Sequence, residues 1–140
     1  MEHFTKVKAV LALLLAAAGS HAVAGWVEVG TDGQNTVYAD PASIRRDKGM
    51  VKMWCLTDKK SNAVVYRSSP PSSPPPYVSA RSQLEFDCKG EKVRSLYTSS
   101  FSGSMGEGTR LTSNTEPSAW EPIPPGTIEE ALWKQACAKR

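Results

Sequence analysis

Met50-Val51-Lys52-Met53-Trp54-Cys55-Leu56-Thr57-Asp58 is the stretch of sequence that decides the fold. It combines branched, aromatic and sulfur side chains over the length of one strand, and two lysines after Asp58 continue a polar cluster that is typical of a turn. Side chains alternate along a strand, so every second residue shares a face. Because both alternating faces are largely apolar, the stretch predicts a central strand that is covered on both sides.

Strands are predicted on either side of this central strand. Residues 26–30 and 36–39 flank a segment rich in turn formers and predict a hairpin. Asp40-Pro41 is expected to end the second strand, and Ala42-Ser43-Ile44 to form one helical turn. Residues 45–49 then lead into the central strand as a basic turn whose cations, Arg45, Arg46 and Lys48, can bind an acidic partner, although a solvated turn is the simpler interpretation.

Two further strands, residues 79–88 and 92–101, are predicted after the central strand. In the first, Leu84, Phe86 and Cys88 share one face, whereas Glu85 and Asp87 share the other. Two such carboxylates can act as a general acid/base pair, but the solvated outer face of an antiparallel sheet is the preferred interpretation. In the second strand, strict alternation places Val93, Tyr97 and Phe101 on a common face.

The remaining segments predict loops. Residues 67–77 contain five prolines, which lack amide donors, and must leave the sheet as a Pro-rich loop. A Pro-rich ligand for an aromatic-groove domain is disfavoured because such partners are mostly cytosolic. Residues 102–108 resemble a phosphate loop only in composition, since no helix pattern follows, and predict a mobile loop. Residues 109–118 are expected to be irregular, with at most a short strand.

A helix is predicted over residues 127–139. Thr127 and Glu130 have the spacing of a capping box, and acidic residues precede basic ones along the segment. An apolar stripe at helical spacing, which needs a sheet to lie on, contains Leu132, Trp133, Ala136 and Cys137. The fold class is therefore α+β: a small antiparallel meander of about five or six strands with a carboxy-terminal helix packed on one face.

Three cysteines allow one disulfide. Cys88 on an inward strand face and Cys137 on the apolar helix stripe are the preferred partners in an oxidising compartment, which would leave Cys55 as a buried free thiol. Pairing of Cys55 with Cys137 is the alternative.

The first 24 residues predict export. Lys6 and Lys8 form a basic start, residues 10–18 are a Leu/Ala run, and Ala22-Val23-Ala24 precedes Gly25 as a signal peptidase requires. A membrane span needs about 20 apolar residues, more than this run has. We therefore expect a signal peptide over residues 1–24, with an uncleaved anchor as the less favoured alternative, and a single domain over residues 25–140 in the periplasm or on the outer cell surface.

Charge and histidine content argue against several functions. The formal net charge is +3, and loss of two lysines and one glutamate with the leader would lower it to about +2, too little to favour nucleic acid or anionic lipid. Both histidines, His3 and His21, lie in the predicted leader, so the mature chain would have no imidazole for a catalytic triad or a zinc site. We expect no enzyme activity, no cofactor, no metal and no stable membrane span.

Four motifs follow one another along the mature chain: Val37-Tyr38-Ala39-Asp40-Pro41 with Ser43-Ile44-Arg45, then residues 51–58, then Glu85-Phe86-Asp87-Cys88, and finally Trp120 through Pro125-Gly126-Thr127 to Cys137. Their order and spacing resemble the surface-adhesin protein E family of Gram-negative bacteria. The resemblance implies a small antiparallel sheet with a carboxy-terminal helix and, for the namesake of the family, attachment to host extracellular proteins. It assigns no ligand-binding residue, and Cys55 and the Pro-rich loop look like departures from the family.

Two functions are compatible with the sequence. The first is an exported adhesin-like protein whose loops, residues 67–77 and 102–108, contact host extracellular matrix or serum proteins. The alternative is a periplasmic envelope protein that binds or inhibits a partner without host adhesion. One helix covers only one face of a sheet, so the other face is expected to stay partly apolar and to favour a homodimer.

Overall fold

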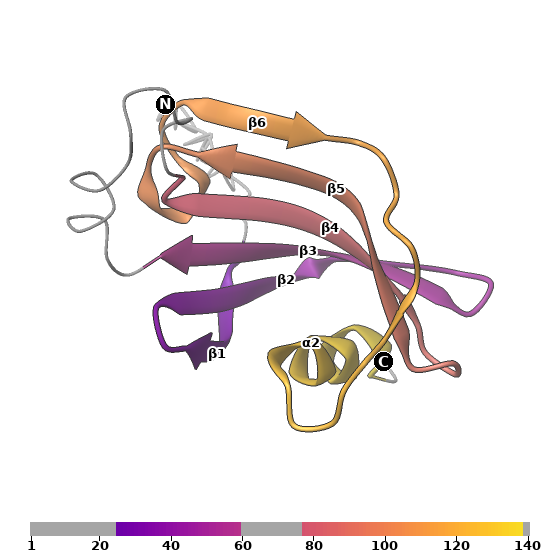
Figure 1. Ribbon diagram of the computed structural model, residues 1–140. Coiled ribbons are helices and arrows are strands. Elements are labelled where there is room, and N and C mark those ends of the chain that lie inside the picture. Colours follow the sequence, from indigo (N-terminus) through magenta and orange to yellow (C-terminus); the bar gives the residue numbers. More distant parts are fainter. Residues whose placement is uncertain (1–24, 60–76, 139–140) are drawn as a thin grey trace, which may run out of the picture.

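The computed structural model describes residues 25–59 and 77–138, and an antiparallel sheet dominates it (Figure 1). The strands from β1 to β6 are neighbours in chain order, and β7 pairs with β5. The elements are β1 Val27–Asp32, β2 Asn35–Asp47, β3 Met50–Lys59, β4 Ser79–Asp87, β5 Lys92–Phe101, the 3-10 turn η1 Ser104–Gly106, β6 Arg110–Asn114, β7 Glu121–Pro122 and the helix α2 Ile128–Cys137. The predicted α+β meander with a carboxy-terminal helix is confirmed, with β7 as an addition.

The strand β3 is central, as its sequence predicts, because β2 and β4 pair with it along its length. We call the side of the sheet that carries α2 the inner face and the opposite side the outer face. Val51, Met53 and Cys55 point inward and are buried in the main core. On the outer face Leu56 is also fully buried. Both faces of β3 are thus covered, although by different parts of the chain.

The strand β2 does not break at Pro41, and the predicted helical turn at residues 42–44 is wrong. The register with β3 shifts between Asp40 and Arg45, so the chain bulges outward and then resumes pairing. Ser43 stabilises this bulge, because its hydroxyl donates to the Asp40 carbonyl at 2.6 Å and accepts from the Trp54 amide at 2.8 Å. Side-chain hydrogen bonds replace the ladder bonds that Pro41 cannot make.

A second bulge changes the faces of β5. Gln83 lies opposite Tyr97 while Leu84 lies opposite Ser95, so Leu96 is an extra residue. Strict alternation is lost at that point, since one inserted residue moves all later side chains to the other face. The predicted common face of Val93 and Tyr97 is therefore wrong: Val93 packs against the inner core, whereas Tyr97 lies on the outer face.

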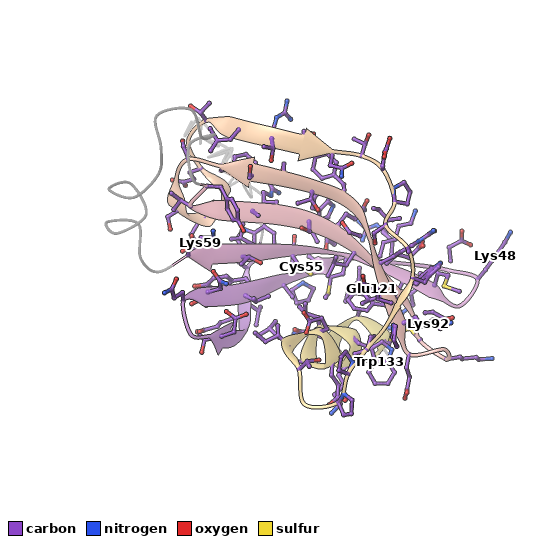
Figure 2. All side chains as sticks on the ribbon, in the orientation of Figure 1. Lys48, Cys55, Lys59, Lys92, Glu121 and Trp133 are labelled. Carbon is purple, nitrogen blue, oxygen red and sulfur yellow. A yellow bond between two sulfur atoms is a disulfide. The ribbon has the colours of Figure 1, made fainter. Side chains whose placement is uncertain are left out.

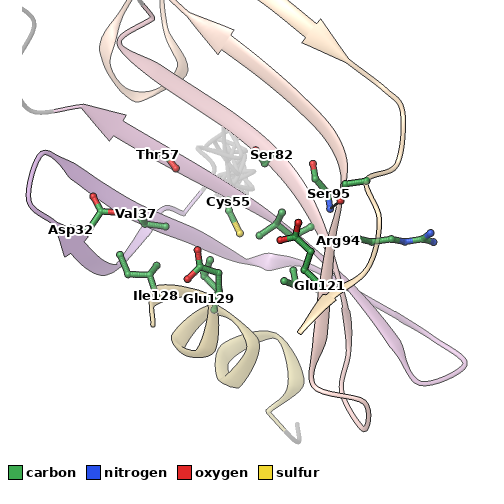
Figure 3. A pocket seen from close by; sticks show the side chains of 14 residues that line it. Asp32, Val37, Cys55, Thr57, Ser82, Arg94, Ser95, Glu121, Ile128 and Glu129 are labelled. Carbon is green, nitrogen blue, oxygen red and sulfur yellow. Dashed lines mark hydrogen bonds between the residues drawn. The ribbon is translucent and has the colours of Figure 1, made fainter. Parts of the chain in front are cut away.

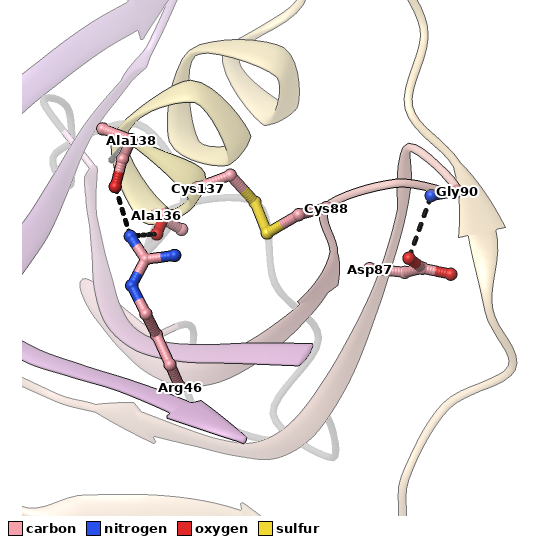
Figure 4. The surroundings of a disulfide bond; sticks show 7 residues. All are labelled: Arg46, Asp87, Cys88, Gly90, Ala136, Cys137 and Ala138. Atoms are coloured by element: carbon pink, nitrogen blue, oxygen red, sulfur yellow. Dashed lines mark hydrogen bonds between the residues drawn. A yellow bond between two sulfur atoms is a disulfide. The ribbon is translucent and has the colours of Figure 1, made fainter. Parts of the chain in front are cut away.

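The helix α2 begins where the sequence predicts. The Thr127 hydroxyl accepts from the Glu130 amide at 3.3 Å, which is half of the predicted capping box. The Glu130 carboxylate pairs instead with Lys134 one turn later, at 3.2 Å. Leu132 and Ala136 of the predicted stripe are buried against the sheet. The Arg46 guanidinium donates to the backbone carbonyls of Ala136 and Ala138 at the end of the helix (Figure 4). The partial negative charge at the carboxy-terminal end of a helix favours a cation in this position.

A disulfide between Cys88 and Cys137 joins the end of β4 to the end of α2 (Figure 4). The two Cα atoms are 5.7 Å apart, the separation that is typical of disulfides. Cys55 is a buried free thiol. The structure thus confirms the preferred pairing of Cys88 with Cys137. The alternative pairing of Cys55 with Cys137 is wrong.

Two sequence predictions lie outside the described residues. The predicted signal peptide, residues 1–24, is one, and the Pro-rich loop, residues 67–77, is described only at Tyr77. Within the described ranges, no helix is long and apolar enough to cross a membrane.

We expect loss of the disulfide to lower the free energy of unfolding by up to about 4 kcal/mol, because the bond closes a loop across 49 residues. Urea unfolding of the variant carrying Cys88→Ser and Cys137→Ser, compared with the oxidised protein, measures the difference. Cys55→Ala is the control. This variant keeps the disulfide, so its free energy of unfolding should still fall when the disulfide is reduced. An unfolding midpoint that reduction leaves unchanged would contradict the structural role of the bond.

Candidate functional site

The outer face carries a cluster of aromatic and arginine side chains from five parts of the chain. The register between β3, β4 and β5 aligns Trp54, Gln83 and Tyr97 across the sheet. The bulge at Leu96 is what turns Tyr97 to this side. We call the following set the outer cluster: Trp26, Trp54, Arg81, Tyr97, Phe101 and Arg110.

Arg81 is at the centre of the outer cluster. Its guanidinium carbon lies 5.7 Å from the ring centroid of Trp26 and 5.7 Å from that of Trp54. A cation this close to an aromatic face is attracted by the negative potential above the ring. The Arg81 Nε atom is buried and has no hydrogen-bond partner among the described residues. The guanidinium is therefore held by the faces of two indole rings.

Trp54 and Tyr97 extend the cluster across the sheet. Their ring centroids are 5.5 Å apart and the ring planes meet at 68°, an edge-to-face geometry that aromatic pairs prefer. Together with Arg81, Phe101 and Arg110 they line an open depression of about 540 Å³. These aromatic residues are only half-buried, so the depression presents ring surface and cationic groups to the solvent.

The Tyr97 hydroxyl is polarised by its neighbours. The Ser113 hydroxyl donates to it at 3.3 Å. This hydrogen bond is the main reason that the pKa of Tyr97 lies below its ordinary value, with smaller contributions from Ser99 and from Arg110. A phenol whose ionised form is favoured is a stronger hydrogen-bond donor, which suits an acceptor on a partner.

The turn η1 borders the outer cluster. The Asp58 carboxylate accepts from the Ser104 hydroxyl at 2.8 and 2.9 Å and from the Met105 amide at 3.1 Å. Gly106 has a positive φ of +74°, and a Cβ there would lie 2.9 Å from Arg81 Cδ, so only glycine lets this turn pack so closely on Arg81. Residues 102–108, predicted as a mobile loop, are thus anchored to the end of β3.

Glu85 and Arg94 form an ion pair beside the outer cluster. Arg94 Nη2 lies 2.6 Å from Glu85 Oε1, and Glu85 is 7% exposed. The guanidinium also lies 4.6 Å from the ring centroid of Trp120. The predicted solvated position of Glu85 is wrong, because Arg94 and the chain around Trp120 cover it. Asp87 instead accepts from the Gly90 amide at 2.9 Å, so the two carboxylates serve different partners and form no acid/base pair.

The three cations of the predicted basic turn have different surroundings. Lys48 extends from the tip of the β2–β3 hairpin at one end of the sheet (Figure 2). Arg46 is used to bind the carbonyls of α2, whereas Arg45 donates to the backbone of its own strand. The turn is therefore partly structural, which supports the simpler interpretation of this turn over an acidic-partner site.

The family model for surface-adhesin protein E matches residues 26–138. The chain belongs to the surface-adhesin protein E family. Comparison with curated protein sequences finds no match.

The protein E family fold is also seen in solved structures. Crystal form II of Haemophilus influenzae protein E is 18% identical, with a TM-score of 0.60 over 81% of this chain and 87% of that chain. Protein E from non-typeable Haemophilus influenzae is 17% identical, with a TM-score of 0.55 over 79% of this chain and 73% of that chain. At these identities the likeness shows the fold of the family and assigns no residue.

Within this member of the family, the sequence did not reveal the outer cluster. Alternation along residues 50–58 places Trp54 on the opposite side of the strand from Met53 and Cys55, but its partners come from other strands and from Trp26 near the beginning of the described chain. Alternation along β4 places Arg81 on the same face as Gln83. This was the one signal in the sequence that pointed to the outer cluster. Nothing in the sequence marked the extra residue Leu96, on which the position of Tyr97 depends.

We expect Ser113→Ala to raise the pKa of Tyr97 toward the ordinary value, about 10, since it removes the main hydrogen bond that favours the phenolate. The tyrosinate absorbance as a function of pH measures it, with Tyr97→Phe to identify the contribution of this one tyrosine. Thr112→Ala is the control, because Thr112 bonds Ser100 rather than Tyr97. An identical titration of Tyr97 in Ser113→Ala and the parent would contradict the assignment.

Proposed function

We propose that this protein is an exported adhesin-like binding protein that attaches to host extracellular matrix or serum proteins through its outer face. Membership of the surface-adhesin protein E family supports a protein partner and an exported location. The observation that carries the choice of face is Arg81 between the rings of Trp26 and Trp54, at the side of an open depression.

The composition of the outer cluster is that of a protein interface. Tryptophan, tyrosine and arginine are the residues most often found at the energetic centres of such interfaces, because they combine a large apolar area with directional polar groups. The depression is wide and open, which suits a protein surface better than an enclosed small molecule. Arg81 and Arg110 favour a partner that offers carboxylates to this face.

The anchored turn at residues 102–108 forms one border of the proposed binding face. Its bonds to Asp58 hold it in place before a partner arrives, which lowers the entropy lost on binding. The turn thus contributes to the proposed binding face as a fixed border. The sequence had instead predicted that residues 102–108 contact a partner as a mobile loop.

We expect Arg110→Ala to weaken binding to a matrix or serum protein about five- to thirty-fold, the effect of truncating an important interface residue. Surface plasmon resonance with purified matrix and serum proteins measures it. Arg110 is exposed, so the variant should fold as the parent does. The matched control is Lys134→Ala, which removes an exposed cation of α2, on the face of the sheet opposite to the outer cluster. Equal losses in both variants would indicate a general charge effect and contradict the assignment of the face.

The alternative function, a periplasmic protein that binds or inhibits an envelope partner, differs in location. Protease treatment of intact cells, with a periplasmic protein as control, distinguishes the two. Cleavage of this chain while the control survives supports the surface location. Protection until the outer membrane is opened contradicts host adhesion and would direct the search to cross-linked partners within the envelope.

A homodimer through the outer face is a further proposal, because half-buried aromatic side chains remain on the face that α2 does not cover. The arginines work against it, since a two-fold axis near the depression would bring Arg81 and Arg110 close to their own copies. Sedimentation equilibrium at high micromolar concentration tests the proposal. A dimer that Tyr97→Ala dissociates supports it, and a monomeric mass at that concentration contradicts it.

A further inference from the structure

A second hollow lies on the inner face, between the sheet and α2, on the opposite side of the molecule from the outer cluster (Figure 3). Its volume is about 340 Å³, within the range of small-molecule sites. The apolar part of its lining comes from the strands and from the helix: Val37, Cys55, Leu84, Val93, Ile128 and Leu132. We call this hollow the inner pocket.

Hydroxyl groups line one side of the inner pocket. They belong to Thr57, Ser82, Ser95 and Ser118, which come from β3, β4, β5 and the segment after β6. Ser82 and Ser95 each bond the hydroxyl of Thr98, at 3.3 and 3.0 Å. Hydroxyls held in this way keep acceptor lone pairs, so the wall can accept hydrogen bonds from a ligand donor.

The charges at the inner pocket are of one sign. Asp32, Glu121 and Glu129 are exposed residues of its lining, and Figure 3 shows the carboxylates of Glu121 and Glu129 on either side of Cys55. The one cationic residue of the lining is Arg94, whose side chain points away from the pocket and is paired with Glu85 on the outer face. The carboxylates around the inner pocket therefore have no cationic side chain of the lining to neutralise them.

Cys55 forms part of the floor. Burial raises the pKa of its thiol to about 12, so at neutral pH the group is protonated and uncharged. A thiol in this state behaves as a small apolar side chain and is a poor nucleophile. The floor is thus suited to non-covalent contact with an apolar group.

We propose that the inner pocket binds a small organic cation with an apolar body, such as a primary amine on a short alkyl or aryl chain. The apolar body rests on the floor formed by β3, β4 and α2. The ammonium group lies at the opening, where the carboxylates attract it and the hydroxyls accept its hydrogen bonds. This site is separate from the proposed adhesive face and does not depend on it.

Titration with 2-phenylethylamine, followed by amide chemical shifts in nuclear magnetic resonance, tests the proposal. Shifts should concentrate at Thr57, Ser82 and Ser95, and the amine should bind more tightly than uncharged 2-phenylethanol. The variant carrying Glu121→Gln and Glu129→Gln should bind the amine about three- to ten-fold more weakly, as expected for two exposed ion contacts, and should bind the alcohol unchanged.

The matched control carries Glu28→Gln and Glu107→Gln, which removes two exposed carboxylates that do not line the inner pocket. Its affinity for the amine should equal that of the parent. Shifts scattered over the surface, equal binding of amine and alcohol, or equal losses in the two double variants would each overturn the proposal. None of these results bears on adhesion, which is measured with protein partners and the outer-face variants.

Discussion

The alternation of side chains along β3 is the constraint on which the rest of the structure depends. Its inward side chains, among them Met53 and Cys55, need an apolar cover, and α2 supplies it. Its outward Leu56 needs another, which the turn η1 and the neighbouring side chains provide. Because the two covers come from distant parts of the chain, each is attached separately: α2 by the disulfide of Cys88, and η1 by the carboxylate of Asp58.

The two faces consequently differ in what they can do. The inner face is closed by a helix whose position a covalent bond stabilises, and its side chains serve the core first. The outer face has no α-helix over it among the described residues, and the aromatic side chains of the outer cluster are half-buried. A surface of this kind can contact a partner without exposing the core.

Charge is distributed unevenly between the faces, although the net charge of the whole chain is only +3. Arg81 and Arg110 lie at the outer depression, whereas Glu121 and Glu129 lie at the inner pocket. Local potential at a concave site is set by the nearest charges rather than by the net charge. The charged side chains at the two hollows of this small fold are therefore mainly of opposite sign.

The sequence alone determined the elements whose signals are local. The alternation in residues 50–58, the cap at Thr127 and the apolar stripe of the helix were enough for the meander, for α2 and for the preference of Cys88 over Cys55 as the partner of Cys137. Tertiary structure alone decided the rest. The bulge at Leu96, the continuation of β2 past Pro41 and the stacking of Arg81 on Trp26 depend on hydrogen bonds and contacts between strands, which residue order does not contain. Both candidate binding surfaces are built from such contacts.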